Sequence, residues 1–253
     1  MIYGLYLSAT GVLTNSYRQD VIANNLANAE TVGFKRDLAL FQEQRTEAQR
    51  RGLNPATCSN PLLEGLGGGL RVRPTYVDNT PGEMEQTGNP LDVAIQGSGY
   101  FAVNDQGQTL LTRDGRFLIG RDGYLAMASG GQHVLDSAGK PIPLDPNLQA
   151  SINQDGTITQ NGQPVGRIGV YGVPEGTQLT KRGRSMLAGP DAKQLQALPG
   201  NLRSEFVERA NVESSTELVA LLDAQRQLEA NANMIRYQDQ TLSRLVNDVA
   251  KIG

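Results

Sequence analysis

Residues 218–250 read LVALLDAQRQLEANANMIRYQDQTLSRLVNDVA, and this stretch decides the fold. It contains neither proline nor glycine, and residues that suit a buried seam recur along it every seven positions. One series consists of Leu221, Leu228, Ile235, Leu242 and Val249. A second series, with two polar members, consists of Leu218, Gln225, Ala232, Asp239 and Val246. Together they predict a helix from about Val212 to Ile252 with a coiled-coil seam.

The start of the chain carries a second apolar stripe. Apolar residues fall at steps of three and four residues at Ile2, Tyr6, Ala9, Leu13 and Tyr17. Helix is expected from Met1 onward, Gly33 is a C-cap or turn residue, and a second short helix is expected over Asp37–Arg51. A single helix with a narrow seam has no core of its own, and each fully buried Leu or Ile stabilises by about 1.5–3 kcal/mol. The two terminal helices are therefore expected to pair.

The middle of the chain favours β structure, because short apolar runs alternate with turn residues from about Pro90 to Leu187. Strands are expected at Asp92–Gln96, Tyr100–Val103, Thr109–Thr112, Arg116–Ile119, Tyr124–Met127 and Val165–Val173. Hairpin turns are expected at Asp114-Gly115, Asp122-Gly123, Asp155-Gly156 and Asn161-Gly162. Asn, Asp and Gly accept the positive φ that tight hairpin turns require. The region is expected to form an antiparallel sheet, barrel or sandwich of irregular strands.

These patterns predict an α+β fold, in which the terminal helices pair as a coiled coil and the central domain is mainly antiparallel β. The expected parts are an N-terminal helical segment at 1–51, an extended linker at 52–89, the central β domain at 90–203 and a C-terminal coiled-coil helix at 204–253. The linker is rich in Gly and Pro, and within it Leu70–Tyr76 is expected to be extended. The two chain ends would meet in space, and the β domain would project from them.

Charge and cysteine content narrow the function. The formal net charge is −3, and beyond Lys181–Arg184 there is no basic stripe, so nucleic acid is not an expected partner. Cys58 is the only cysteine, which excludes a disulfide within the chain and weakly favours a reducing compartment. Met1–Tyr17 lacks the basic start of a secretory signal, and no stretch is apolar enough to span a bilayer. If the protein is exported, we expect export without a cleavable signal peptide.

Three features suggest catalysis or ligand binding, and each has a simpler explanation. Gly65–Gly69 lacks the preceding strand and following helix of a dinucleotide loop, so a hinge is expected. His133 is the only histidine, and it comes with neither a metal-ligand set nor a nucleophile elbow. Several aspartates of the β region closely precede glycines, where turn formation explains them. We expect no catalytic residue, no cofactor, no metal and no small-molecule substrate.

Three sequence blocks, in chain order, resemble the bacterial flagellar rod and hook proteins. The matching residues are Ile22–Leu26 with Ala27–Arg36 (ANAETVGFKR), Thr87–Phe101 (TGNPLDVAIQGSGYF) with Thr112–Phe117 (TRDGRF), and Asn211–Glu213 with Ala224–Arg226 and Asn231. The resemblance covers both ends and the first half of the β region. Three blocks in the same order are far more specific than any one of them.

The resemblance implies a structural subunit of the flagellar basal-body rod, proximal rather than distal, that polymerises through paired terminal helices into the axial drive shaft. The implied partners are copies of the same chain, other axial proteins of the rod and hook, and the flagellar type III export apparatus. The implied location is the basal body, spanning the periplasm. The alternative is a β-rich binding module or adhesin on a coiled-coil stalk, which would need only one long helix.

The resemblance and the two stripes place the expected assembly interface at both ends of the chain. It comprises Ile22, Asn24, Asn25, Leu26, Asn28, Phe34, Leu218, Leu221, Gln225, Leu228, Ala232, Ile235, Leu242 and Val249. The Asn and Gln side chains in this set either hydrogen-bond laterally to neighbouring subunits or face solvent.

Overall fold

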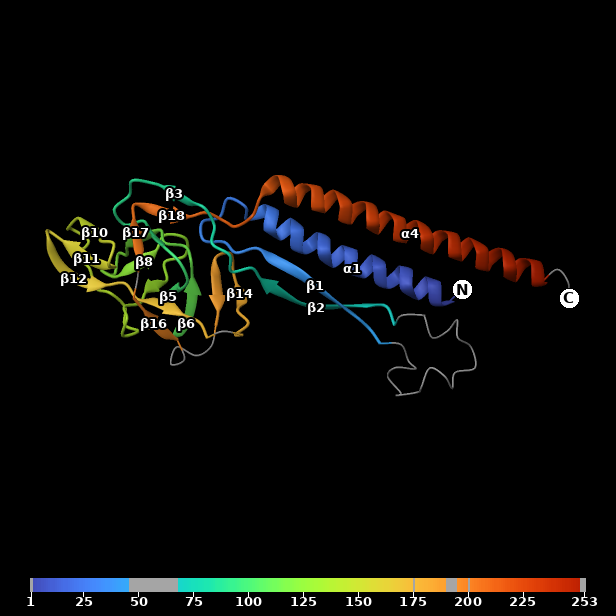
Figure 1. Cartoon of the computed structure of the whole chain (residues 1–253), viewed down its shortest axis with the longest axis horizontal. Helices are drawn as coiled ribbons and strands as arrows, with labels where there is room; N and C mark the ends of the chain where they lie inside the picture. Colours follow the sequence, from blue (N-terminus) through green and yellow to red (C-terminus); the bar gives the residue numbers. More distant parts are fainter. Residues whose placement is uncertain (1, 46–67, 175, 190–194, 200, 251–253) are drawn as a thin grey trace. The chain divides into compact units, whose positions relative to one another are not determined.

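The computed structural model describes residues 2–45, 68–174, 176–189, 195–199 and 201–250 (Figure 1). The chain divides into two compact units, and each is built from segments that are distant in sequence. The helical unit comprises Met1–Leu26, Asp37–Tyr76 and Ser214–Gly253. The β unit comprises Ala27–Arg36 and Val77–Glu213. The fold is therefore α+β, with a helix near each end of the chain and antiparallel sheets between them.

The helical unit contains two long helices and a β-hairpin. Helix α1 spans Ile2–Ala27 and helix α4 spans Ser214–Ala250, and the two run antiparallel (Figure 1). Two glycines of α1 allow a close approach of α4. A Cβ atom on Gly4 would lie 2.7 Å from Nε2 of Gln238, and one on Gly11 would lie 2.8 Å from Nδ2 of Asn231.

The second short helix predicted over Asp37–Arg51 is wrong for the residues that the structure describes. Asp37–Glu43 is strand β1, which pairs with β2 (Leu70–Val77), so the predicted extended segment at Leu70–Tyr76 is confirmed. The Gln- and Glu-containing sequence has a helical propensity, but strand pairing and packing against α1 override it. Tyr17 of α1 and Phe41 of β1 make an edge-to-face contact with ring centroids 6.5 Å apart. Residues 46–51 lie outside the described part of the chain.

On the least exposed face of α4, one set of positions lies one residue before the predicted second heptad series. The first predicted series lies on this face, where Leu221, Leu228, Ile235 and Leu242 are half-buried. The other positions of the face are Glu217, Ala224, Asn231 and Gln238. The predicted Leu218, Gln225, Asp239 and Val246 are exposed. Both the predicted second series and the observed face contain polar residues, so composition alone does not choose between them. The glycines of α1 leave space for two amide side chains of the observed face, those of Asn231 and Gln238.

The β unit contains one large sheet and several small ones. Within the described residues, the large sheet has nine strands: seven in the order β14-β15-β6-β5-β9-β8-β7, with β13 paired to β5 and β16 paired to β13. A separate three-stranded sheet has the order β10-β11-β12. Strands β17 and β4 form one further pair, and β18 and β3 form another. All pairings are antiparallel. The strand bounds are β3 Met84–Gln86, β4 Val93–Ile95, β5 Tyr100–Asp105, β6 Gln108–Thr112, β7 Phe117–Ile119, β8 Leu125–Met127, β9 His133–Val134, β10 Ala150–Ile152, β11 Thr157–Gln160, β12 Gln163–Arg167, β13 Val170–Gly172, β14 Thr180–Arg182, β15 Met186–Ala188, β16 Gln196–Leu198, β17 Leu202–Ser204 and β18 Phe206–Glu208.

The turn signals predicted three hairpins correctly and one wrongly. Asp122-Gly123, Asp155-Gly156 and Asn161-Gly162 connect β7 to β8, β10 to β11 and β11 to β12. Asp114-Gly115 is not a hairpin turn, because β6 and β7, on either side of it, pair with other strands. The five shorter predicted strands are present, but Val165–Val173 is divided between β12 and β13. The core of the unit includes the edge-to-face pair Phe101 and Phe117, with centroids 5.2 Å apart.

Candidate functional site

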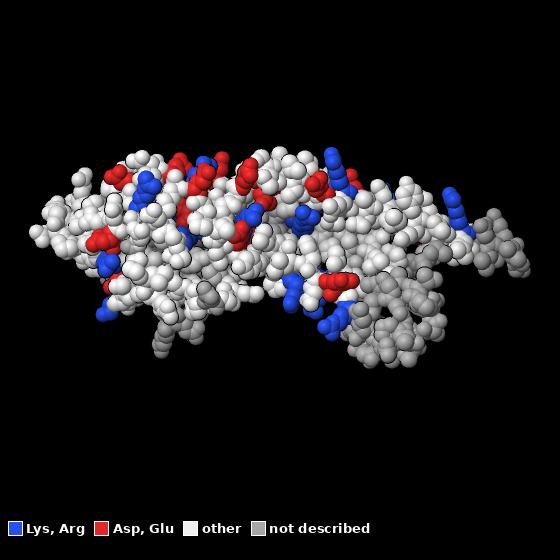
Figure 2. All heavy atoms as spheres, in the orientation of Figure 1, with Lys and Arg blue, Asp and Glu red and all other residues white. Residues whose placement is uncertain are grey.

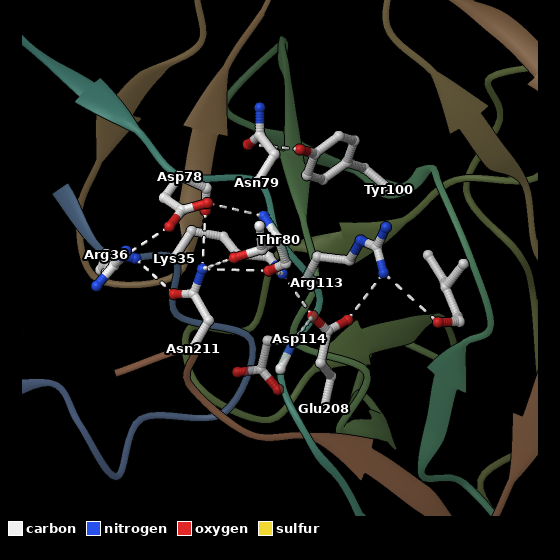
Figure 3. Close-up of polar contacts among 12 residues, drawn as sticks. Lys35, Arg36, Asp78, Asn79, Thr80, Tyr100, Arg113, Asp114, Glu208 and Asn211 are labelled. Atoms are coloured by element: carbon white, nitrogen blue, oxygen red, sulfur yellow. Dashed lines mark hydrogen bonds and ion pairs between the residues drawn. The ribbon is translucent and has the colours of Figure 1, made fainter. Parts of the chain in front are cut away.

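The β unit contains a polar network at the places where the chain passes from one unit to the other. The chain changes unit four times, after residues 26, 36, 76 and 213. Three segments of the β unit adjoin these crossings: residues 27–36, 77–82 and 205–213. Side chains of these segments and Arg113 converge on one cluster, in which Lys35, Arg113 and Glu208 are buried (Figure 3). We call this cluster the crossing network; it consists of Lys35, Arg36, Asp78, Thr80, Arg113, Glu208 and Asn211.

Glu208 lies at the centre of the crossing network and is 1% exposed. Its Oε1 atom accepts hydrogen bonds from Nζ of Lys35 at 2.5 Å and from the backbone N–H of Gly82 at 3.0 Å. Its Oε2 atom accepts one from Nη1 of Arg113 at 2.8 Å. Lys35 also donates to the carbonyl of Thr80 at 2.7 Å, and the side chains of Lys35 and Arg113 are 2% and 4% exposed. One buried carboxylate thus holds two buried cations.

Burial of this triad has an electrostatic cost that its ion pairs and hydrogen bonds offset. Moving a charged group out of water costs several kcal/mol, and attraction in the interior repays this only when geometry and hydrogen bonding are good. Burial lowers the pKa of Lys35 below its ordinary value of 10.5, against the opposing effect of the hydrogen bond and charge of Glu208. The same Glu208 carboxylate therefore compensates the charge of both cations.

Asn211 joins the three crossing segments through its side-chain amide. Its Oδ1 atom accepts the backbone N–H of Arg36 at 2.8 Å. Its Nδ2 atom donates to the carbonyls of Asp78 at 2.9 Å and Thr80 at 3.1 Å. Arg36 also donates through Nε to Oδ2 of Asp78 at 2.8 Å. Partial burial raises the pKa of Asp78, but hydrogen bonds from Thr80 and Arg36 outweigh it, so the pKa lies below its ordinary value of 3.8.

Gly33 and Phe34 bring the first crossing segment against the β unit. Gly33 has a φ of +69°, and its N–H donates to the carbonyl of Glu208 at 2.7 Å. A Cβ atom at this position would lie 2.2 Å from the backbone N of Asp114, so only glycine fits without a shift. Phe34 is 1% exposed, and Nζ of Lys181 lies 3.6 Å from its ring centroid. The predicted turn at Gly33 is confirmed, and its reason is this close approach.

The predicted interface residues of the N-terminal block have different surroundings. Asn25 is 2% exposed, and its amide exchanges two hydrogen bonds of 2.9 Å with the backbone N–H and carbonyl of Asp37. Ile22 is buried, Leu26 and Asn28 are half-buried, and Asn24 is exposed. Asn25 and Phe34 are thus occupied within a single chain.

On α4, the predicted interface residues fall into two groups. Leu221, Leu228, Ala232, Ile235 and Leu242 are half-buried, whereas Leu218 and Gln225 are exposed. Val249 lies in α4, but its side chain is outside the described set.

The helical unit carries most of the exposed large apolar side chains. Among the described residues, every such side chain except Leu118 and Val165 lies in this unit. Among the described side chains of α4, only those of Glu217 and Ala224 are buried. Figure 2 displays few charged side chains on the face of the two helices in view towards the chain termini. The exposed residues are Tyr6, Leu7, Leu13, Leu40, Phe41, Leu70, Tyr76, Leu218, Val219, Leu222, Met234, Tyr237, Leu245 and Val246.

The residues considered for catalysis or metal binding lie in other surroundings. Nε2 of His133 contacts Oδ2 of Asp122 at 2.5 Å, on the surface of the β unit. The side-chain oxygens of Asp136 and Asp155 accept backbone N–H groups two residues further on, and for Asp155 this agrees with the predicted turn. In the described part of the chain, no group of three or more His, Cys, Asp or Glu residues is placed to hold a metal ion. Neither described helix combines the length and apolarity that a bilayer crossing requires.

Sequence reasoning did not identify Glu208 or the buried Asp114. Glu208 is the only acidic residue of a short strand, and its cationic partners are 173 and 95 positions away. Asp114 is fully buried and bonds Arg116 at 2.9 Å, although its sequence context is typical of a turn. Four of the seven residues of the crossing network do lie inside the three blocks quoted above, namely Lys35, Arg36, Arg113 and Asn211.

Comparison with known proteins gives matches along most of the chain. Three family profiles match: "Flagella basal body rod protein" at residues 5–35, "Flagellar hook protein FlgE/F/G D1 domain" at 94–160 and "Flagellar basal body rod FlgEFG protein C-terminal" at 203–248. The flagellar basal-body rod protein FlgF of Mesorhizobium japonicum is 33% identical over 239 residues, covering 92% of this chain and 91% of that protein. The rod protein FlgG of Bacillus subtilis is 30% identical over 265 residues, covering 98% and 99%. FlgG of Buchnera aphidicola subsp. Schizaphis graminum is 31% identical, covering 97% and 99%.

Proposed function

The chain belongs to the flagellar basal-body rod protein family, and we propose that it polymerises through its helical unit into the axial shaft of the rod. The family is structural and is not known for enzymatic activity. Membership implies a location in the basal body and a role in motility. The observation that supports polymerisation is the concentration of exposed large apolar side chains in the helical unit.

The helical unit exposes more large apolar side chains than is usual for a surface that stays in contact with water. Leu13, Val219, Tyr237 and Val246 are 67%, 59%, 66% and 65% exposed. Fully burying a large apolar side chain stabilises by about 1.5–3 kcal/mol, and contiguous exposed apolar patches mark interaction surfaces. Neighbouring rod subunits are the natural partners, because each copy presents the same surface.

Within one subunit, we infer that α1 and α4 pair as an antiparallel coiled coil. Gly4 faces Gln238 and Gly11 faces Asn231, so both glycines and both amides are seven residues apart. A seven-residue spacing on both helices keeps one seam between them. The same register continues to Asn25 and Glu217 at the other end, and both of these residues are buried.

This register divides the expected interface residues into two sets. Leu221, Leu228, Ile235 and Leu242 would form the seam within a subunit. Leu218 and Gln225 would face neighbouring subunits, since they are exposed. The partners would be other copies and other axial proteins, and delivery would use the flagellar type III export apparatus. A proximal position in the rod stays a prediction, because relatives named FlgF and FlgG match at 33% and 31% identity.

Complementation of a strain that lacks the gene tests the polymer interface. Leu222→Asp and Tyr237→Asp place charges on exposed apolar positions of α4, and Gln227→Asp places the same charge at an exposed polar position. We expect the first two variants to abolish swimming and to be absent from purified basal bodies. The Gln227→Asp variant should assemble. Normal incorporation of both apolar-site variants would refute the proposed interface.

A second pair of variants tests the seam within the subunit. Leu228→Asp combined with Ile235→Asp should prevent assembly while the β unit keeps its circular dichroism spectrum. Deletion of residues 1–30, and separately of 218–253, should also prevent assembly. A subunit that assembles after either deletion would contradict the paired-helix arrangement.

A further inference from the structure

The first and last crossing segments of the β unit depend on each other for their polar partners. Gly33 donates to the carbonyl of Glu208, Lys35 to its carboxylate, and Arg36 to the side chain of Asn211. In return, the backbone N–H of Asn211 donates to the carbonyl of Phe34 at 3.4 Å. These contacts join residues 173 to 177 positions apart, so local structure cannot form them early.

Neither segment has an adequate substitute partner if the other is absent. Without Glu208, the nearly fully buried Lys35 and Arg113 side chains would face each other with no anion between them. Leaving a buried charge without its counterion is strongly unfavourable. Arg113 would still donate to the carbonyl of Gly97 at 2.7 Å, so it has a reason to stay in place. Lys35 would keep only the carbonyl of Thr80 and would gain by moving into water.

The rest of the β unit does not need this contact. The main sheet is built from strands β5 to β9 and β13 to β16, and its core includes Phe101, Val103 and Val134. These side chains are apolar and fully buried, and Glu208 lies on β18, in a separate strand pair with β3. The sheet can therefore stay folded while the crossing segments are released.

We propose that Glu208 is the positioning residue that makes residues 33–36 and residues 205–211 dock as one cooperative event. The two segments lead directly into β1 and α4, and the first also follows α1. If the side chain of residue 208 does not contact Lys35 and Arg113, or carries no negative charge, both segments stay undocked. This inference concerns a single chain, so it stands independently of polymerisation.

Hydrogen–deuterium exchange on the purified full chain tests the coupling. Glu208→Gln keeps the shape of the side chain but removes its charge. We expect exchange to become at least about tenfold faster in peptides covering 28–36 and also in peptides covering 205–213. Peptides covering 100–112 should keep their protection. The matched control is Glu85→Gln, on the strand paired with β18, where the carboxylate is 60% exposed and lies 3.6 Å from Arg209; it should change none of these peptides.

Faster exchange in 205–213 alone, with 28–36 still protected, would show that the segments dock independently and would overturn the proposal. Unchanged exchange in both would do the same. If Glu208→Gln does not fold, Asn211→Ala provides the test, because it leaves the ionic triad intact and removes the bridge to Arg36 and Asp78. It should also loosen both segments together, and loosening of only one would again contradict cooperative docking.

Discussion

Substituting Gly33 by alanine measures how much the β unit depends on the close approach at the first crossing. The φ of +69° disfavours an L-residue by about 1–2 kcal/mol. The added Cβ atom would also lie 2.2 Å from the backbone N of Asp114 and 2.4 Å from the carbonyl carbon of Arg113. Backbone atoms cannot rotate away as a side chain can, and overpacking costs about 1–3 kcal/mol. We therefore expect Gly33→Ala to lower the free energy of unfolding by about 2–5 kcal/mol in total.

Gly88→Ala is the matched control, because Gly88 has a φ of +73° in the same unit and a Cβ atom there would meet nothing within 4 Å. It should lose only the backbone contribution, about 1–2 kcal/mol. The assay is urea unfolding followed by far-ultraviolet circular dichroism, since the chain contains no tryptophan. The two midpoints should differ clearly. If both variants are destabilised equally, the packing of residue 33 against residues 113–114 contributes nothing and the reasoning is wrong.

Three further changes test other contacts. Because folding lowers the pKa of Lys35, the unfolded chain binds more protons than the folded chain between the folded pKa and 10.5. The free energy of unfolding should therefore rise with pH in this window. Lys35→Met should reduce that rise, as measured by urea unfolding at several pH values. A steeper rise in the variant would contradict the burial argument. Asn25→Ala removes two partners of the Asp37 backbone and should cost about 1–3 kcal/mol, seen as faster amide exchange at the start of β1; unchanged exchange would count against the contact. Gly11→Ala should lower the melting temperature of the helical circular dichroism signal, since the new Cβ atom would lie 2.8 Å from the Asn231 side chain. A higher melting temperature would mean that the gain in helix propensity, about 1 kcal/mol, exceeds the cost of this close contact.

The sequence predicted most of the elements whose signals are local. Strands such as Tyr100–Asp105 alternate with turn residues that need positive φ, and Gly123, Gly156 and Gly162 have it. The exception, Asp114-Gly115, has the same local chemistry as these turns. Asp114 packs instead against Gly33, 81 positions earlier in the chain, where a Cβ atom would lie 2.2 Å from the Asp114 backbone N. A dipeptide signal carries no information about such contacts.

The errors in the helical unit have a related cause. Asp37–Glu43 is a strand because β2, about 30 residues later, pairs with it and α1 covers one face. On α4, less exposed residues recur every seven positions, but one set of them lies one residue before the predicted second series, where Asn231 and Gln238 contact Gly11 and Gly4 of α1. Period is a property of one helix, whereas phase is a property of the pair.

The crossing network also explains why a structural subunit would bury three charges where apolar residues would be at least as stabilising. Replacing a buried ion pair by well-packed apolar side chains is often neutral or favourable for stability. An apolar cluster, however, tolerates many packings, whereas Glu208 accepts bonds from Lys35, Gly82 and Arg113 in one arrangement only. The helical unit exposes a large apolar surface, and the segments that lead to it would be free to collapse onto the wrong partner if their docking were unspecific. A polar junction penalises every wrong docking of these segments by an unpaired charge, so residues 33–36 and 205–211 have one favoured arrangement within the β unit.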